Sequence, residues 1–183
     1  MGMPATQAYW TVEQMRALPD DGRRYEVVYG ELLVSPGPSL RHQRVSSELF
    51  VRLHGYLQEH GGGHVFYAPA SVHHSTSTEV QPDLFVLSAG ADINAPRARL
   101  DEVLLAIEVL SPSTARHDRF TKRRLFREVG IAQYWIVDMD ARTVEVWTPD
   151  AESPLVQRER LIWSAPGAPT PLALVFDEVF APL

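Results

Sequence analysis

Cysteine is absent from the 183-residue sequence. The fold therefore depends on neither disulfides nor thiolate zinc sites, and the reducing cytoplasm is the expected location. The N-terminal stretch has no basic segment followed by an apolar one, so no signal peptide is expected. No apolar run reaches the roughly 20 residues that span a bilayer, so no membrane partner is expected either. Internal repeats and low-complexity linkers are also absent.

The sequence also has no excess of positively charged residues. Lysine and arginine together number 17 against 23 aspartates and glutamates, and the formal net charge is −6. This balance argues mildly against nonspecific binding to nucleic acid, which usually needs a basic footprint, but it leaves room for a local basic face. The hydrophobic content of 45% and charged content of 22% are typical of a globular protein. The length predicts one domain over residues 1–183 with a substantial core.

Two short apolar runs, residues 82–87 and 104–110, each contain one carboxylate. Both runs have the length and the leucine, valine and isoleucine content of strands. Asp83 begins the first run and Glu108 nearly ends the second, so the two acids lie side by side if the strands are antiparallel neighbours. Burying a carboxylate in such a run is costly unless it is paired or binds a cation. Two oxygen ligands at one sheet edge suit a hard cation such as magnesium.

Residues 115–130 form a predicted helix with a single cation on its inward face. At roughly 100° per residue, Asp118 and Lys122 share a face with apolar side chains. An ammonium group on that face needs an anion nearby, and the candidates are Asp83, Glu108 and Asp118. An adjacent face either contacts a phosphate backbone or is an ordinary solvated surface. It carries four arginines, Arg116, Arg119, Arg123 and Arg127.

The rest of the chain is predicted to form short strands, hairpins and one further long helix. Ser39 caps that helix, and His42 lies on its apolar face, where a lone histidine is usually a core residue. Glu26 and Glu31 lie in two short strands joined by a turn, and Glu26 faces either solvent or the interior. Together these elements predict an α/β or α+β fold. It consists of a mixed sheet flanked by two principal helices, with added hairpins.

An ordered set of short strings resembles one branch of the PD-(D/E)XK nucleases. The strings span most of the chain and are, in order, Arg24-Tyr25-Glu26, Gly30-Glu31-Leu32, Ser35-Pro36, Arg41-His42, Gln81-Pro82-Asp83, Glu108 to Thr114, Asp118 with Lys122, and Tyr134 to Asp138. They are similar to those of the Uma family of endonucleases, which has a restriction-endonuclease-like fold. The broad superfamily has its lysine two residues after the glutamate, and that position is Leu110 here. The resemblance implies that the lysine has moved to the following helix, as Lys122.

The activity that this resemblance implies is metal-dependent hydrolysis of phosphodiester bonds in DNA. Asp83 and Glu108, with the carbonyl of Val109, would hold magnesium or manganese. Such an ion lowers the pKa of a bound water and neutralises charge on the phosphate. Lys122 would orient that water or stabilise the phosphate oxygens.

Accessory roles follow from the same resemblance. Asp118 or Glu31 would add a ligand or hold the lysine, and His42 would line the site. The four arginines would follow the phosphate backbone as positioning contacts. Many nucleases of this fold cut two strands with two subunits, so fold-level analogy alone suggests a homodimer.

Two alternatives stay open at the level of the sequence. The chain could keep the fold without nuclease activity and serve as a binding or assembly module, which the acidic balance favours. It could also be a metal-dependent hydrolase that acts on something other than DNA. The sequence names neither a DNA site nor a choice between DNA and RNA.

Overall fold

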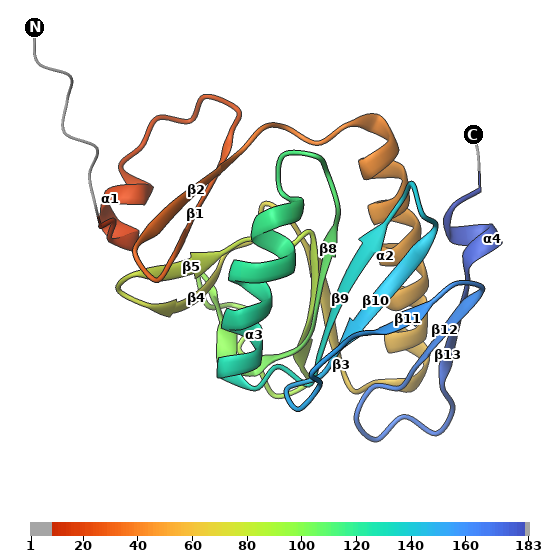
Figure 1. Ribbon diagram of the computed structural model, residues 1–183. Helices are drawn as coiled ribbons and strands as arrows, with labels where there is room; N and C mark the ends of the chain where they lie inside the picture. The colour runs from red at the N-terminus through yellow and green to blue at the C-terminus, as the bar shows by residue number, and fades with distance from the viewer. Residues whose placement is uncertain (1–8, 182–183) are drawn as a thin grey trace, which may run out of the picture.

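A six-stranded mixed sheet forms the centre of the computed structural model, which describes residues 9–181 and so leaves the two ends of the expected domain outside it. Neighbouring strands are antiparallel except β8 and β9, which are parallel. In order across the sheet the strands are β11 (Leu155–Gln157), β10 (Thr143–Trp147), β9 (Gln133–Asp138), β8 (Val103–Val109), β6 (Leu84–Ser88) and β3 (Gly63–Tyr67). This arrangement confirms the predicted fold class (Figure 1).

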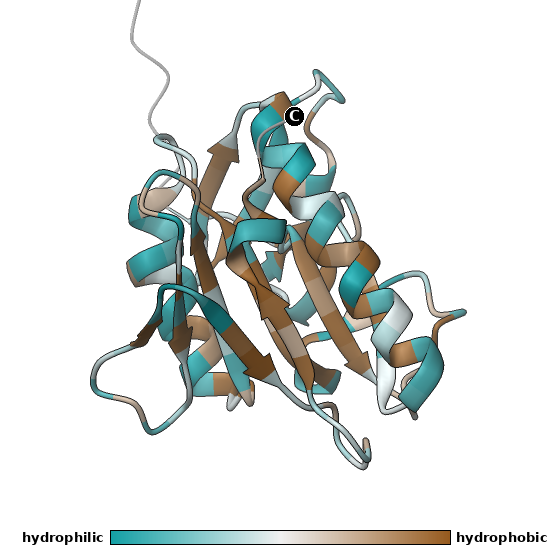
Figure 2. Ribbon diagram, turned by 90° about the vertical axis from the view of Figure 1, so that its right-hand side faces the viewer, coloured by the Kyte–Doolittle hydropathy of each residue, from teal (hydrophilic) through white to brown (hydrophobic). Residues whose placement is uncertain are grey.

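Helices cover both faces of this sheet (Figure 1). One face is covered by α2 (Leu40–His60), which Ser39 caps as expected. The other is covered by η2 (His117–Lys122) and α3 (Arg123–Val129). The central strands are hydrophobic along most of their length, while the helices alternate between hydrophilic and hydrophobic residues (Figure 2). The two principal helices predicted from the sequence therefore enclose the sheet.

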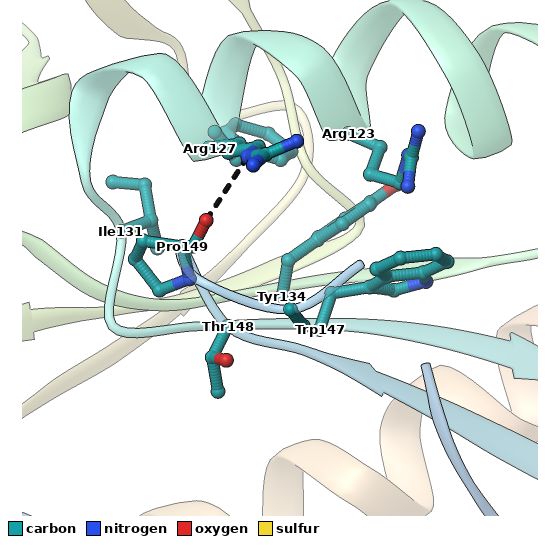
Figure 3. Close-up of a pocket in the computed structure, with 9 residues that line it drawn as sticks. Arg123, Arg127, Ile131, Tyr134, Trp147, Thr148 and Pro149 are labelled. Atoms are coloured by element: carbon teal, nitrogen blue, oxygen red, sulfur yellow. Dashed lines mark hydrogen bonds between the residues drawn. The ribbon is translucent and has the colours of Figure 1, made fainter. Parts of the chain in front are cut away.

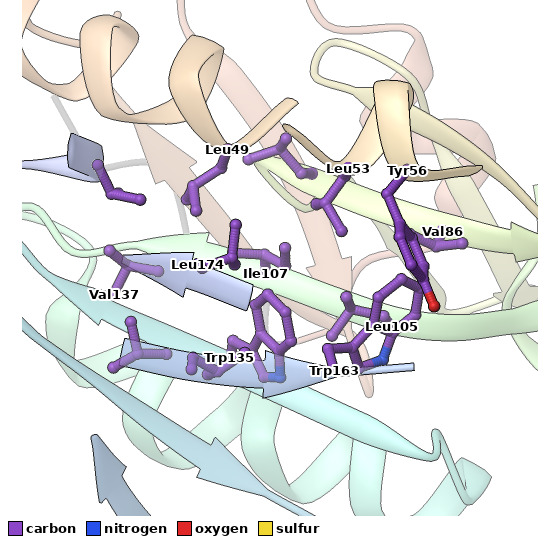
Figure 4. Close-up of a cluster of buried hydrophobic side chains, with 14 of the residues drawn as sticks. Leu49, Leu53, Tyr56, Val86, Leu105, Ile107, Trp135, Val137, Trp163 and Leu174 are labelled. Carbon is purple, nitrogen blue, oxygen red and sulfur yellow. The ribbon is translucent and has the colours of Figure 1, made fainter. Parts of the chain in front are cut away.

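Side chains along β8 alternate between the two faces of the sheet. Leu105 and Ile107 join the cluster formed with α2, to which Leu53 contributes (Figure 4). Ala106 joins the cluster on the η2–α3 side. Glu108 shares the parity of Ala106, so its carboxylate points toward η2 and not toward α2.

A second sheet has the strand order β2-β1-β5-β4-β7. Its strands are β2 (Glu31–Ser35), β1 (Arg24–Val28), β5 (Thr78–Val80), β4 (Val72–Ser75) and β7 (Ala98–Arg99). The sequence predicted the β1–β2 hairpin, but not that β4 and β5 join it in a separate sheet. As a result the start of β1 lies beside the segment leading into β6, where Arg24 Nη1 donates to the carbonyl of Gln81.

Short elements complete the described chain. Helix α1 (Val12–Arg16) begins with a capping box between Thr11 and Gln14. The others are η1 (Leu100–Glu102), the pair β12 (Arg160–Trp163) and β13 (Leu172–Val175), and α4 (Phe176–Val179). No helix in residues 9–181 is both long and apolar enough to cross a membrane.

The helix predicted over residues 115–130 is not a continuous α-helix. Residues 115–116 are α-helical, η2 is a π-helix, and α3 is again α-helical and ends at Gly130 with φ of 82°. A π-helix makes i→i+5 hydrogen bonds and is often found at functional sites. Asp118 and Lys122 are both buried in this wide turn. The sequence placed them on the inward face, although it did not predict the π geometry.

Candidate active site

Asp83 and Glu108 lie next to each other at the same end of the central sheet. Strands β6 and β8 are antiparallel neighbours with Leu84 opposite Ile107, so Asp83, which directly precedes β6, lies opposite Glu108. Asp83 is 6% exposed and Glu108 is 0% exposed. The antiparallel pairing agrees with the prediction from the sequence.

Three donors hold the carboxylate of Asp83. Arg24 Nη1 donates to Oδ1 at 2.7 Å, and the amide of Val109 donates to Oδ2 at 2.8 Å. His42 Nε2 lies 3.0 Å from the same Oδ2. Burial alone raises the pKa of Asp83, but the hydrogen bond with His42, the charge of Arg24 and the Val109 amide outweigh it and hold the pKa well below its usual range. Asp83 is therefore ionised in the folded protein.

The ammonium group of Lys122 is surrounded by carboxylates. Its Nζ lies 2.7 Å from Glu108 Oε1, 2.9 Å from Glu26 Oε1 and 3.7 Å from Asp118 Oδ1. Burial lowers the pKa of Lys122, but the three carboxylates outweigh this effect and raise the pKa above its ordinary value. The group therefore stays charged although it is only 1% exposed. Lys122 is also the only lysine in the sequence. Lys122 therefore approaches Glu108 and Asp118, two of the three acids expected from the sequence, and its remaining partner is Glu26 instead of Asp83.

The carboxylates around Lys122 are not fully compensated. Burial, aided by neighbouring acids, raises the pKa of Glu108 well above its usual value despite the opposing charge of Lys122. Burial likewise raises the pKa of Asp118. Within residues 9–181, Glu108 Oε2 and both carboxylate oxygens of Asp118 are buried without a hydrogen-bond partner. Such oxygens are costly to bury, so the site has spare capacity for a cation or for protons.

Glu26 and Arg24 belong to the site, and sequence reasoning missed both roles. Glu26 is 1% exposed and, besides contacting Lys122, accepts a hydrogen bond of 2.7 Å from the amide of Gln81. Their spacing is a signal that could have revealed both roles. Residues two apart on a strand share a face, and Arg24 and Glu26 have opposite charges.

The structure places Glu31, which was expected to be an accessory residue, away from the other site residues. Glu31 is exposed at the start of β2 and lies opposite Val28, whereas Arg24 lies at the other end of the same hairpin. About four residues of strand, at roughly 3.3 Å each, separate the two ends. The acid of this hairpin that enters the site is therefore Glu26.

A cleft of about 840 Å³ opens at this end of the sheet. Asp83, His42 and Arg24 are among the residues that line it, and so are the loops 36–39 and 111–114. Glu108 and Lys122 do not line it. The Asp83 carboxylate with its partners thus forms a layer between the cleft and the buried Lys122 cluster.

The four arginines expected to follow a phosphate backbone do not line this cleft. Arg119 binds Glu145 at 3.0 Å and Asp138 at 3.3 Å. Arg123 lies 4.3 Å above the ring of Trp147, and Arg127 Nε donates to the carbonyl of Pro149 at 3.0 Å (Figure 3). Of the four, Arg116 is exposed and lies just before η2. Tertiary contacts therefore occupy three of these side chains, and the predicted role of all four in nucleic-acid binding stays a prediction.

The residues at the end of β6 and β8 fit magnesium or manganese better than zinc. Among the described residues, no three histidine, aspartate or glutamate side chains are grouped so that they could hold a metal ion. Magnesium, however, is usually held by only one or two carboxylates together with waters and substrate phosphates. Glu108 Oε2 is free of hydrogen bonds, and three donors use three of the roughly four acceptor positions of Asp83. These donors are therefore all oxygen, as a hard cation prefers, with Asp83 at the cleft and Glu108 buried behind it.

Acid is expected to remove the stabilisation that Asp83 supplies. Its pKa is lower in the folded protein than the ordinary 3.8, so its contribution to the free energy of unfolding is present above about pH 4 and is lost as the pH falls through the folded-state value. Urea unfolding of the parent and of Asp83→Asn should differ by on the order of 2 kcal/mol at pH 6. The difference should shrink near pH 2, because protonated Asp83 resembles asparagine. A difference that is constant with pH would contradict this account.

Comparison with known proteins bears on the family and on the fold. The family Uma2, described as "Putative restriction endonuclease", matches residues 12–176. Among solved structures, the crystal structure of "a putative nuclease belonging to DUF820" from Anabaena variabilis is similar, with a TM-score of 0.77 and 21% sequence identity over 94% of this chain and 98% of that chain. No curated protein matches. At this identity the structural likeness shows a shared fold.

Proposed function

The chain belongs to the Uma2 family, and from that membership we propose that it is a metal-dependent endonuclease that hydrolyses phosphodiester bonds in DNA. The observation that carries the proposal is the position of Glu108, which lies opposite Asp83 and contacts Lys122. The two acids lie opposite each other at the ends of β6 and β8, and Lys122 Nζ is 2.7 Å from Glu108. Two carboxylates and a cation at one end of a sheet are suited to holding a metal ion and a phosphate together.

Asp83, Glu108 and the main-chain carbonyl of Val109 are the groups that would hold magnesium or manganese. Such an ion supplies charge neutralisation at the phosphate and activation of a water molecule. Leu110 donates its amide to the carbonyl of Val137 on β9, so the polar groups of Val109 face the β6 side, where its amide reaches Asp83. The main chain at Val109 therefore faces Asp83, the acid with which it would hold the metal ion.

The remaining polar side chains of the site fix the two acids and the lysine. Arg24 and His42 hold Asp83 in its ionised form and set its orientation. Glu26 and Asp118 flank the ammonium group of Lys122. That cation lies beside Glu108, where it would stabilise negative charge that develops on the phosphate oxygens.

Magnesium or manganese is expected to raise the melting temperature of the protein. An ion that binds only the folded state at a hundredfold excess over its dissociation constant adds about 2.7 kcal/mol, or about 5–10 °C for a chain of this size. Glu108→Gln should show little of this rise, because it removes one anionic ligand. Glu31→Gln, which changes an exposed acid away from the site, should respond like the parent. Differential scanning calorimetry with each ion, and with a chelator, measures the effect.

The same measurement separates an enzyme from an inert module. Equal shifts in the parent and in Glu108→Gln would mean that the ion binds elsewhere. The direct companion test is cleavage of DNA with magnesium or manganese and its loss on addition of a chelator. No shift and no cleavage would favour a binding or assembly module of the same fold.

A further inference from the structure

The cleft at the end of the central sheet carries little positive charge. Of the side chains that line it, only Arg23 and Arg24 are lysine or arginine. Arg24 donates to Asp83, and Arg23 Nε lies 3.5 Å from Asp21 Oδ2. Proteins that bind duplex DNA typically neutralise about 6–10 phosphates with lysine and arginine. The cleft therefore lacks the cations needed to hold both backbones of a duplex.

An exposed aromatic ring lines the same cleft. Tyr67, at the end of β3, is 59% exposed. Its ring packs edge-on with that of Phe50 at 5.0 Å and 79°, and Phe50 in turn stacks on His54 at 5.5 Å. These contacts position the tyrosine ring while leaving more than half of its surface open. Exposed, supported aromatic rings are the platforms on which unpaired bases stack.

Tyr67 lies close to Asp83. It pairs with Leu84, the residue that follows Asp83, and the amide of the next residue, Ala68, donates to the Asp83 carbonyl at 3.1 Å. Because Tyr67 shares the face of Leu84, its ring lies on the α2 side, and His42 of α2 also contacts the Asp83 carboxylate. Tyr67 and Asp83 both line the cleft. A strand that lies along the cleft would meet the ring and Asp83 in succession.

Apart from the two arginines, Asp20, Asp83 and His42, the polar groups of the cleft are neutral. They include the amides of Gln43 and Gln81 and several hydroxyls, among them those of Ser39, Ser46, Ser111 and Ser113. Neutral donors and acceptors of this kind suit base edges and single phosphates. In a duplex the Watson–Crick edges are paired and the base faces are stacked, so neither is available to this lining.

We propose that the cleft takes single-stranded DNA and that an unpaired base stacks on Tyr67 while the adjoining phosphodiester lies at Asp83. This inference rests on the proposed nuclease function and names its substrate class. Binding energy then comes mainly from stacking and neutral hydrogen bonds. Binding of this kind needs few ionic contacts with phosphates and so agrees with the net charge of −6.

Binding is tested by fluorescence anisotropy with a labelled oligothymidylate and a duplex of equal length, in magnesium, using Glu108→Gln protein so that the probe stays intact. The single strand should bind at least tenfold more tightly than the duplex. In that background Tyr67→Ala should weaken single-strand binding about 5- to 150-fold, the range for loss of one stacked base, and Tyr67→Phe should restore it. Phe120→Ala removes an aromatic side chain that is 64% exposed but lies outside the cleft, and it should have no effect.

Salt provides an independent readout. With at most the two arginines of the cleft in contact with phosphates, the logarithm of affinity should fall with the logarithm of salt with a slope of about −1.4 for a single strand. A slope steeper than about −4 would show that basic residues outside the cleft dominate and would overturn the proposal.

The outcomes also separate the two proposals. Metal-dependent cleavage of duplex DNA with equal or tighter duplex binding, or single-strand binding that ignores Tyr67→Ala, would refute the single-strand inference and leave the nuclease function intact. Single-strand binding that depends on Tyr67, but without cleavage by the parent in either metal, would refute the nuclease function. Melting temperatures of the Tyr67 variants confirm that they are folded, as expected for a change at an exposed position.

Discussion

Replacing Glu108 with glutamine is expected to reduce DNA cleavage by about 10²- to 10³-fold or more while the protein stays folded. Glutamine keeps the shape of the side chain and an oxygen that Lys122 can contact, but it removes the negative charge that a metal ion requires. Burial raises the pKa of Glu108 well above its usual value, so ionising it is unfavourable. Its loss should therefore leave the free energy of unfolding unchanged or higher in the absence of metal.

The assay is cleavage of labelled DNA at saturating magnesium or manganese, together with urea unfolding of the same samples. Glu31→Gln is the matched control, since it makes the same chemical change at the exposed end of the hairpin. It should retain full activity. If Glu108→Gln cleaves DNA as fast as the parent, the acids at the ends of β6 and β8 do not form the catalytic centre.

Replacing Lys122 with methionine is expected to abolish cleavage and also to destabilise the fold by about 3–5 kcal/mol at neutral pH. The destabilisation is expected because Glu108, Glu26 and Asp118 would all remain buried without their shared cation. The loss should be smaller at pH 4, where carboxyls left without this cation bind protons.

Glu108→Gln combined with Lys122→Met should recover part of the lost stability, because it removes one of the stranded charges. A coupling energy of about 0.5–3 kcal/mol from the double-mutant cycle would be in the range for residues in contact. Because the chain has a single lysine, side-chain NMR of lysine-labelled protein reports on Lys122 alone. A signal that titrates below its ordinary value of 10.5 would contradict the raised pKa expected among the carboxylates. An unfolding curve of Lys122→Met that matches the parent would refute the stabilising role.

The pairing of strands and the main helix could be predicted because their signals are local. Apolar runs of strand length marked β6 and β8, and Ser39 marked the start of α2. A carboxylate at the end of such a run can be buried only with a partner, so the pattern alone singled out Asp83 and Glu108.

Other features depended on tertiary contacts that local patterns do not encode. Glu26 and Glu31 lie in the same hairpin with similar neighbours, and only the docking of β1 beside residues 81–83 decides that Glu26 is buried. Arg119 looked like a free cation on a helix face, yet Glu145, far away in the sequence, pairs with it. The π geometry of η2 and the exposure of Tyr67 beside the acids likewise follow from how the elements pack. The sequence by itself thus determined which residue types carry the chemistry. The tertiary structure decided which of them meet, because burial and pairing depend on neighbours that are distant along the chain.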